Sequence, residues 1–201
     1  MNYLAHAYLS FGDEQVLVGN LISDFVKGKK KFNYPEGIQR GIVLHRAIDT
    51  YTDAHAVTKL AKDIFRPQYR LYSGAFIDVV YDHFLATDPG EFSETTLHEF
   101  SQNTYNILDR HSKYLPDRFA RMFPYMRSQN WLFNYRTVWG TESSFGGLVR
   151  RAKYLQESQT ACLLFEENYQ ALQHYYQAFF PELKSFTQTM YRDIMKSDSR
   201  P

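Results

Sequence analysis

The sequence predicts a single all-α domain, and three observations carry this prediction. Apolar residues recur with the 3.6-residue period of a helix along most of the chain. Helix-breaking residues are sparse, with 10 glycines and 7 prolines in 201 residues. No internal repeat, low-complexity segment or linker-like stretch divides the chain. Residues 1–201 are therefore expected to form one domain that is long enough to bury a substantial core.

The first elements are placed by capping residues. A short helix is expected over residues 3–10. Asp13 can cap a second helix that runs to Lys27, with Gly28 just past its end. The lysine-rich segment 29–33 then reads as a loop before the next helix.

The remaining elements follow from proline and serine signals. Pro35 suits the first turn of a helix that runs to about Tyr51. Ser93 is the expected cap of a later helix, and Pro181 is expected to kink or break the last one. The further predicted helices span 55–65, 69–86, 94–112, 116–127, 142–156 and 159–195.

Composition excludes several classes of protein. The 23 basic and 22 acidic residues give a net charge of +1, so no general attraction to nucleic acid or to an anionic membrane follows. No apolar run reaches the ~20 residues of a membrane span, and no secretory signal is recognisable. The single cysteine, Cys162, excludes an intramolecular disulfide and a CxxC metal site. A cytoplasmic protein is the simplest interpretation. The 16 tyrosines and 16 phenylalanines fit a helical core, with an aromatic ligand groove as the alternative.

Acids and histidines interrupt otherwise apolar helical patterns in three segments, 19–28, 45–53 and 77–85. Burying an ionised carboxylate costs several kcal/mol unless it is paired or bound to a metal. His45 and Asp49 are four residues apart and continue an apolar helical stripe. Three such interruptions in the first half of the chain predict one shared metal site.

The other two segments follow the same logic. Asp78 and Asp82 share one face of their helix, and His83 points about 100° further round. Asp24 lies near the expected end of its helix, where the macrodipole disfavours a negative charge and a bound cation would offset this. Carboxylate and imidazole ligands without thiolate suit Mn²⁺, Fe²⁺, Zn²⁺ or Mg²⁺. Such a site can lower the pKa of a bound water and neutralise a phosphoryl oxygen, so phosphate-ester hydrolysis is the expected chemistry.

Each of these residues also has a purely structural interpretation. His6 and His45 could be core histidines, and Asp49 could pair with a helix-surface arginine. Asp78 and Asp82 could face solvent if their helix is rotated. Asp53 and His55 could simply end one helix and cap the next.

Four sequence blocks resemble the acyl carrier protein phosphodiesterase family in order and spacing. They are Met1–His6, Gly19–Gly28, Gly41–Asp49 with Thr52 and Asp53, and Asp78–Leu85. The resemblance covers residues 1–86; beyond them it rests on general features such as Trp131-Leu132 and the helical, aromatic C-terminal region.

The resemblance implies a divergent, HD-phosphohydrolase-like helical fold with Mn²⁺ as cofactor. The implied reaction hydrolyses the phosphodiester between 4′-phosphopantetheine and a serine of holo acyl carrier protein, which releases apo carrier and free 4′-phosphopantetheine. The chain departs from the HD pattern because it has no His-Asp dipeptide, only the reversed pair Asp82-His83. The ligand set therefore stays open at this point.

The expected roles are as follows. The metal ligands are Asp24, His45, Asp82 and His83, with Asp49 and Asp78 next in line. Arg46 or Lys27 would stabilise the added negative charge, and His6 or Asp53 would move a proton. The expected catalytic residues are thus His6, Arg46, Asp49 and Asp53.

The lysine run has two interpretations. Lys27, Lys29, Lys30 and Lys31 could be a solvated loop, or a basic lip that steers the acidic carrier protein onto the site. Three rival functions remain: a hydrolase of a small phosphodiester or nucleotide, a non-catalytic helical adaptor with internal ion pairs, and a nucleic-acid binder, which the near-neutral charge argues against.

Overall fold

Helices are the only regular secondary structure of residues 1–196, the part of the chain that the computed structural model describes. The all-α prediction is therefore confirmed. The α-helices are α1 (Tyr3–Tyr8), α2 (Glu14–Ile22), α3 (Glu36–Ala54), α4 (Ala56–Tyr69), α5 (Ser73–Thr87), α6 (Glu94–Arg110), α7 (Asp117–Ser128), α8 (Trp131–Asn134), α9 (Val138–Arg151), α10 (Gln159–Glu167) and α11 (Tyr169–Lys196). Short 3₁₀ helices are η1 (Ser23–Phe25), η2 (Gly28–Asn33), η3 (Arg70–Tyr72) and η4 (Ser112–Tyr114). No helix of this part is both long and apolar enough to cross a bilayer.

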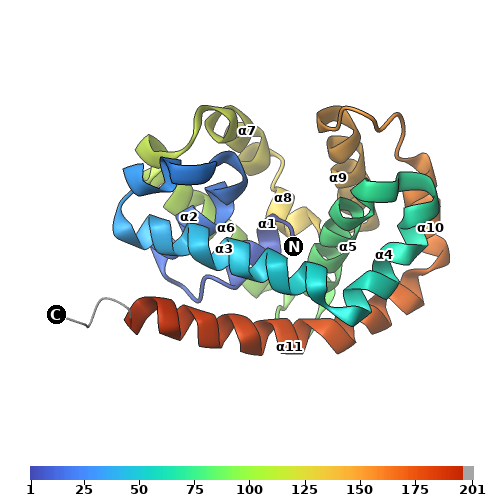
Figure 1. The fold of residues 1–201 in the computed structure, drawn as a ribbon. Coiled ribbons are helices and arrows are strands. Elements are labelled where there is room, and N and C mark those ends of the chain that lie inside the picture. The colour runs from blue at the N-terminus through green and yellow to red at the C-terminus, as the bar shows by residue number, and fades with distance from the viewer. Residues whose placement is uncertain (197–201) are drawn as a thin grey trace.

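The helices form two groups that the long helix α11 joins (Figure 1). Helices α1, α2, α3, α6 and α7 lie on one side, and α4, α5, α9 and α10 lie on the other. Helix α3 begins in the first group and extends to the second, and the N-terminus lies at the centre of the molecule. This arrangement brings α1, α3 and α5 together, the helices whose sequences carry the buried histidines and acids.

Two glycines allow α2 and α3 to touch backbone to backbone. A Cβ atom at Gly19 would lie 2.0 Å from the carbonyl oxygen of Ile38, and one at Gly41 would lie 2.2 Å from that of Val16. Any larger side chain would push the helices apart. Their close contact sets the distance between residues of α2 and α3 that face each other.

Aromatic side chains fill much of the core. The largest fully buried ones are Tyr81, Tyr105, Tyr135, Phe65, Phe76, Phe84, Phe119, Phe145, Phe165, Phe179 and Phe180. Phe65 and Phe76 stack with their ring centroids 5.7 Å apart, and Phe145 meets Phe76 edge to face at 5.2 Å. The core interpretation of the aromatic residues is therefore confirmed for most of them, with a few exposed exceptions described below.

Two capping predictions are confirmed. The Asp13 carboxylate accepts a hydrogen bond from the Val16 N–H at 2.9 Å and begins α2. Ser93 and Thr96 form a reciprocal capping box at the start of α6. The end of α2 was predicted at Lys27, but the α-helix ends at Ile22 and continues as η1.

Three other boundary predictions were wrong. Residues 29–33 lie in the 3₁₀ helix η2 and not in a loop. The segment 159–195 forms two helices, α10 and α11, and Pro181 lies inside α11 without ending it. A proline there loses one backbone hydrogen bond, which the buried Phe179, Phe180 and Leu183 around it outweigh. Helix α9 begins at Val138, capped by Thr137, whereas a start at residue 142 was predicted.

Candidate metal centre

A buried asparagine orients two histidines that come from different helices. The Nδ2 group of Asn20 donates to the backbone carbonyl of His6 at 2.7 Å and to the Ser10 hydroxyl at 3.1 Å. Its Oδ1 atom therefore accepts from His6 Nδ1 at 2.7 Å, and its backbone oxygen accepts from His45 Nδ1 at 2.7 Å. These partners assign the Nδ1–H tautomer to both rings and leave both Nε2 atoms for other contacts.

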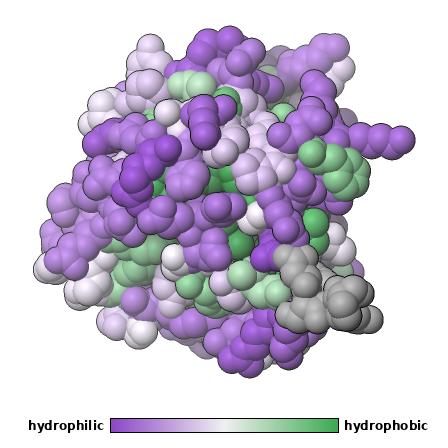
Figure 2. Space-filling model, turned by 90° about the vertical axis from the view of Figure 1, so that its left-hand side faces the viewer, coloured by the Kyte–Doolittle hydropathy of each residue, from purple (hydrophilic) through white to green (hydrophobic). Residues whose placement is uncertain are grey.

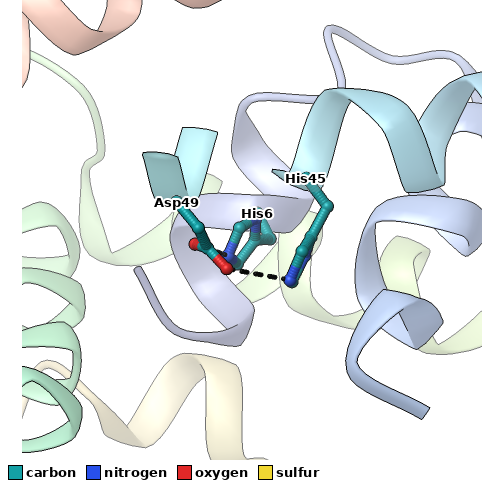
Figure 3. Close-up of side chains that lie close together, drawn as sticks. All are labelled: His6, His45 and Asp49. Carbon is teal, nitrogen blue, oxygen red and sulfur yellow. Dashed lines mark ion pairs between the residues drawn. The ribbon is translucent and has the colours of Figure 1, made fainter. Parts of the chain in front are cut away.

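Both Nε2 atoms point at carboxylates. His6 Nε2 lies 3.2 Å from Asp49 Oδ1, and His45 Nε2 lies 3.1 Å from Asp49 Oδ2. Figure 3 shows how His6 from α1 meets His45 and Asp49 from α3. His45 Nε2 also lies 3.2 Å from Asp24 Oδ1. We call His6, His45, Asp49 and Asp24 the open cluster, because it borders a solvent-facing cavity of about 550 Å³.

The donor atoms of this cluster fit a divalent cation. One ligand atom each from His6, His45 and Asp49 can be chosen so that all lie within 4.8 Å of one another. The buried Nε2 atom of His6 has no aligned hydrogen-bond partner, although Asp49 is near. An imidazole lone pair that faces a carboxylate oxygen is repelled by it. A cation bound between them attracts both the nitrogen and the oxygen. Two imidazole nitrogens and a carboxylate suit Mn²⁺, Fe²⁺ or Zn²⁺.

Without a metal ion, a proton on His45 offsets part of the negative charge of the carboxylates. Burial alone would lower the pKa of His45, but hydrogen bonds to Asp24 and Asp49 outweigh burial and raise it to about 9. Burial and the charge of His45 lower the pKa of His6 to about 4. Burial would raise the pKa of Asp49, yet the Met1 ammonium and both histidines hold it well below its usual range. In the metal-free cluster His45 is thus the protonated, positively charged imidazole at neutral pH, and His6 is neutral.

Asp78 joins the site through an ammonium group. The Met1 α-amino group lies 2.9 Å from Asp78 Oδ1 and 3.5 Å from Asp49 Oδ1. Burial would lower the pKa of this amino group, but Asp78 and Asp49 raise it to about 11. Asp78 therefore has a cationic partner beside the open cluster and does not itself face the two histidines.

Asp82 was expected among the ligands, but the structure gives it another partner set. Its fully buried carboxylate accepts hydrogen bonds from the N–H groups of Asn2 at 3.3 Å, Leu4 at 2.7 Å and Ala5 at 3.1 Å. These are donors of the first turn of α1 that no helical carbonyl can satisfy. Burial raises the pKa of Asp82 to about 7. Asp82 therefore fixes α1, and the alternative that it faces solvent is wrong.

His83 is also enclosed. Its Nδ1 atom donates to the Tyr135 carbonyl at 2.7 Å, and its Nε2 atom lies 2.9 Å from the Tyr169 hydroxyl. Neither Asp82 nor His83 belongs to the group of ligand atoms around Asp49. We call this pair the closed cluster, because protein groups satisfy its polar atoms.

The other expected residues surround the open cluster. Lys27, Arg46 and Asp53 line the same cavity as Asp24 and Asp49. Arg46 donates to the Val26 carbonyl at 3.1 Å, and Asp53 pairs with Lys62 at 2.6 Å.

Lys29, Lys30 and Lys31 follow in η2, where Lys29 and Lys30 are exposed and Lys31 is half-buried. The start of α3 and the end of α11 lie at the left-hand side of Figure 1. Figure 2 views the molecule from that side, and hydrophilic side chains cover most of the face. The lysine run therefore lies close to the open cluster in sequence and faces water.

Sequence reasoning missed the role of Asn20. Its signal is an amide inside the buried run of α2, where every residue from Val16 to Ile22 is buried. A buried amide needs partners for its donors and its acceptor, so it indicates a polar contact on an adjacent helix. Which histidines it would reach depends on the close approach of α2 and α3, which no local pattern gives.

Comparisons with known proteins agree with the sequence blocks. The family model described as acyl carrier protein phosphodiesterase matches residues 1–183. A protein of that name from Yersinia pestis is 32% identical over 184 residues, which cover 91% of this chain and 95% of the relative. One from Klebsiella pneumoniae is 32% identical with the same coverage, and one from Photorhabdus laumondii is 29% identical over 90% of this chain and 92% of the relative.

Among solved structures, no significant match was found. The relation to HD phosphohydrolases therefore stays a prediction. The family model spans far more than half of the chain, and the relatives are covered almost end to end. This chain belongs to the acyl carrier protein phosphodiesterase family.

Proposed function

We propose that this protein is a Mn²⁺-dependent phosphodiesterase that hydrolyses the bond between 4′-phosphopantetheine and a serine of holo acyl carrier protein. Family membership supports the carrier protein as substrate. One observation supports the chemistry: the Nε2 atoms of His6 and His45 converge on the Asp49 carboxylate, and His45 and Asp49 line a cavity open to solvent. The cytoplasmic location stays a prediction.

His6, His45 and Asp49 would hold the cation, with Asp24 as an additional ligand at the rim. When bound, a divalent cation supplies Lewis acidity to a phosphoryl oxygen and favours ionisation of water. In this proposal His6 is a ligand instead of a proton carrier, His45 keeps its expected role as a ligand, and Asp82 and His83 are not ligands. The Nδ1–H bonds to Asn20 would keep both rings in the ligand orientation.

Charged residues around the cavity would assist the reaction. Arg46 and Lys27 border the cavity and would stabilise the negative charge that develops on the phosphoryl group. Asp53 lies at the same border and would accept a proton from the attacking water and pass it to the departing serine oxygen, with Lys62 holding its carboxylate in place.

The exposed lysines of η2 would dock the acidic carrier protein beside the site. Reversing Lys29, Lys30 and Lys31 to glutamate should raise KM for the carrier and make it less sensitive to salt. The same reversal at the exposed Lys59 and Lys113 is the matched control. An unchanged KM at low salt would contradict docking through these lysines.

Intact-mass spectrometry of holo acyl carrier protein tests the proposed reaction. Incubation with this protein and Mn²⁺ should remove the mass of the whole 4′-phosphopantetheine group, and a chelator should prevent the loss. An unchanged mass together with stoichiometric metal binding would favour hydrolysis of a smaller phosphodiester. An unchanged mass without metal binding would favour a non-catalytic helical adaptor.

A further inference from the structure

A cavity that reaches the open cluster adjoins a second cavity further away from it. The first, of about 630 Å³, is lined by Asp24, Met1 and Asp78 at one end and by Tyr3 and Arg151 further along. The second, of about 640 Å³, shares Tyr3 and Arg151 with it. We call the first the linking cavity and the second the aromatic cavity. Because they share these lining residues, the two cavities lie side by side, and we call them together the trough; its linking cavity reaches Asp24.

The aromatic cavity combines exposed rings with amide and hydroxyl groups. Trp139 is 64% exposed and Tyr125 is 62% exposed, although large aromatic side chains are usually buried. Trp131 lines the same space. Between the rings lie side chains that can donate or accept hydrogen bonds, namely Asn2, Gln129, Asn134, Ser143 and Ser144. An apolar concave surface with a few polar groups is typical of a small-molecule site.

Small residues of α9 keep this cavity open. Gly147 lines it, and a Cβ atom there would meet nothing closer than the flexible end of Arg150 at 3.7 Å. Ser143 lines it one turn earlier and is exposed. A larger side chain fits at either position without displacing the backbone. A phenylalanine at residue 143 or 147 would therefore occupy the cavity.

We propose that the aromatic cavity binds the distal, thiol-bearing end of the pantetheine arm while the phosphate lies at the open cluster. This inference rests on the proposed function for the position of the phosphate. The arm is a flexible chain that alternates apolar segments with amide groups and ends in a thiol. The rings would cover its apolar segments, and the amide and hydroxyl side chains would pair with its amides. The trough would thus select diesters that carry this arm.

The first test measures binding without catalysis. The chain has 2 tryptophans, Trp131 and Trp139, and both line the aromatic cavity. Titration with pantetheine, which has no phosphate, should therefore change the intrinsic tryptophan fluorescence in a saturable way. Ser143→Phe and Gly147→Phe should remove this change, because each ring would occupy the cavity. Ser185→Phe, at an exposed serine of α11, is the matched control and should behave as the wild type.

The second test compares two substrates. For holo acyl carrier protein, Ser143→Phe and Gly147→Phe should lower kcat/KM by at least about tenfold. The reason is that binding energy from a remote part of a substrate helps to lower the activation barrier at the reacting bond. Hydrolysis of bis(p-nitrophenyl) phosphate, a diester without the arm, should stay unchanged in both variants. Circular dichroism and thermal unfolding verify that the variants fold.

The outcomes separate this inference from the proposed function. If the wild type releases phosphopantetheine and the folded variants do so with unchanged kcat/KM, the aromatic cavity does not bind the arm. If the wild type does not act on the carrier but pantetheine still changes its fluorescence in a variant-sensitive way, the proposed reaction fails and the binding site stands. Should the variants not fold, the absence of any wild-type fluorescence response to pantetheine would overturn the inference.

Discussion

Two clusters of acids and histidines lie within the first half of this chain, and they have opposite surroundings. In the open cluster, the Nε2 atoms of His6 and His45 face carboxylates at the border of a cavity. In the closed cluster, Asp82 accepts three backbone hydrogen bonds and both ring nitrogens of His83 have protein partners. A polar side chain in an apolar helix pattern therefore indicates a cost of burial, but it does not say what offsets that cost.

The two clusters are connected through α1. Asp82 holds the first turn of this helix, and His6 lies at its second half. The closed cluster thus positions a ligand of the open one. This connection explains how both clusters can fall within the sequence blocks of one family while only one of them presents free donor atoms.

The largest expected difference between the clusters concerns activity. His45→Ala removes the nitrogen that faces both Asp24 and Asp49, so it should lower phosphodiesterase activity and Mn²⁺ affinity by more than about 100-fold. The variant also loses the buried hydrogen bond to the Asn20 carbonyl, so circular dichroism and thermal unfolding must verify that it folds. His174→Ala, at an exposed histidine of α11, is the control. Full activity of a folded His45→Ala variant would remove the open cluster from the proposed mechanism.

The next largest effect concerns stability. Asp82→Asn replaces one acceptor oxygen by an NH₂ group that faces the backbone N–H donors of α1. The loss of a charge-assisted hydrogen bond to a buried donor should lower the free energy of unfolding by about 2 kcal/mol. Urea denaturation measures this at about pH 8.5, above the pKa of about 7 of Asp82, where the carboxylate is ionised. A variant with wild-type stability that had lost its bound Mn²⁺ would instead support Asp82 as a ligand.

A third prediction uses the proton on His45. Because the pKa of this imidazole is raised to about 9 in the metal-free protein, Mn²⁺ must displace a proton at neutral pH. At pH values below 9, the apparent affinity should therefore rise about tenfold for each unit by which the pH increases, because the fraction of His45 that is deprotonated rises by that factor. His6, with its pKa lowered to about 4, adds no proton in this range. Titrations followed by the electron paramagnetic resonance of free Mn²⁺ at pH 6, 7 and 8 measure this slope, and a flat profile would contradict protonation of His45.

The sequence predicted the helical fold and most helix positions because periodicity and caps are local properties. It also predicted that His45, Asp24 and Asp49 lie together, since two of them share one face of a single helix. Local patterns cannot tell that Asp82 and His83 lie apart from the open cluster. Asp82 meets backbone N–H groups only because α1 packs on α5, and His83 is enclosed only because Tyr135 and Tyr169, far along the chain, fold onto it.

The smallest effect is expected at the closed histidine. Gln can keep a donor near the Tyr135 carbonyl, but it cannot span both partners of His83, so His83→Gln should cost about 1 kcal/mol of unfolding free energy. Mn²⁺ affinity and kcat for holo acyl carrier protein should stay within about twofold of the wild type, because neither ring nitrogen reaches the open cluster. Isothermal titration with Mn²⁺ separates the two roles directly. Loss of metal binding in a stable His83→Gln protein would show that the two clusters act as one site, and that the enclosure of His83 by tyrosines does not exclude it from the metal.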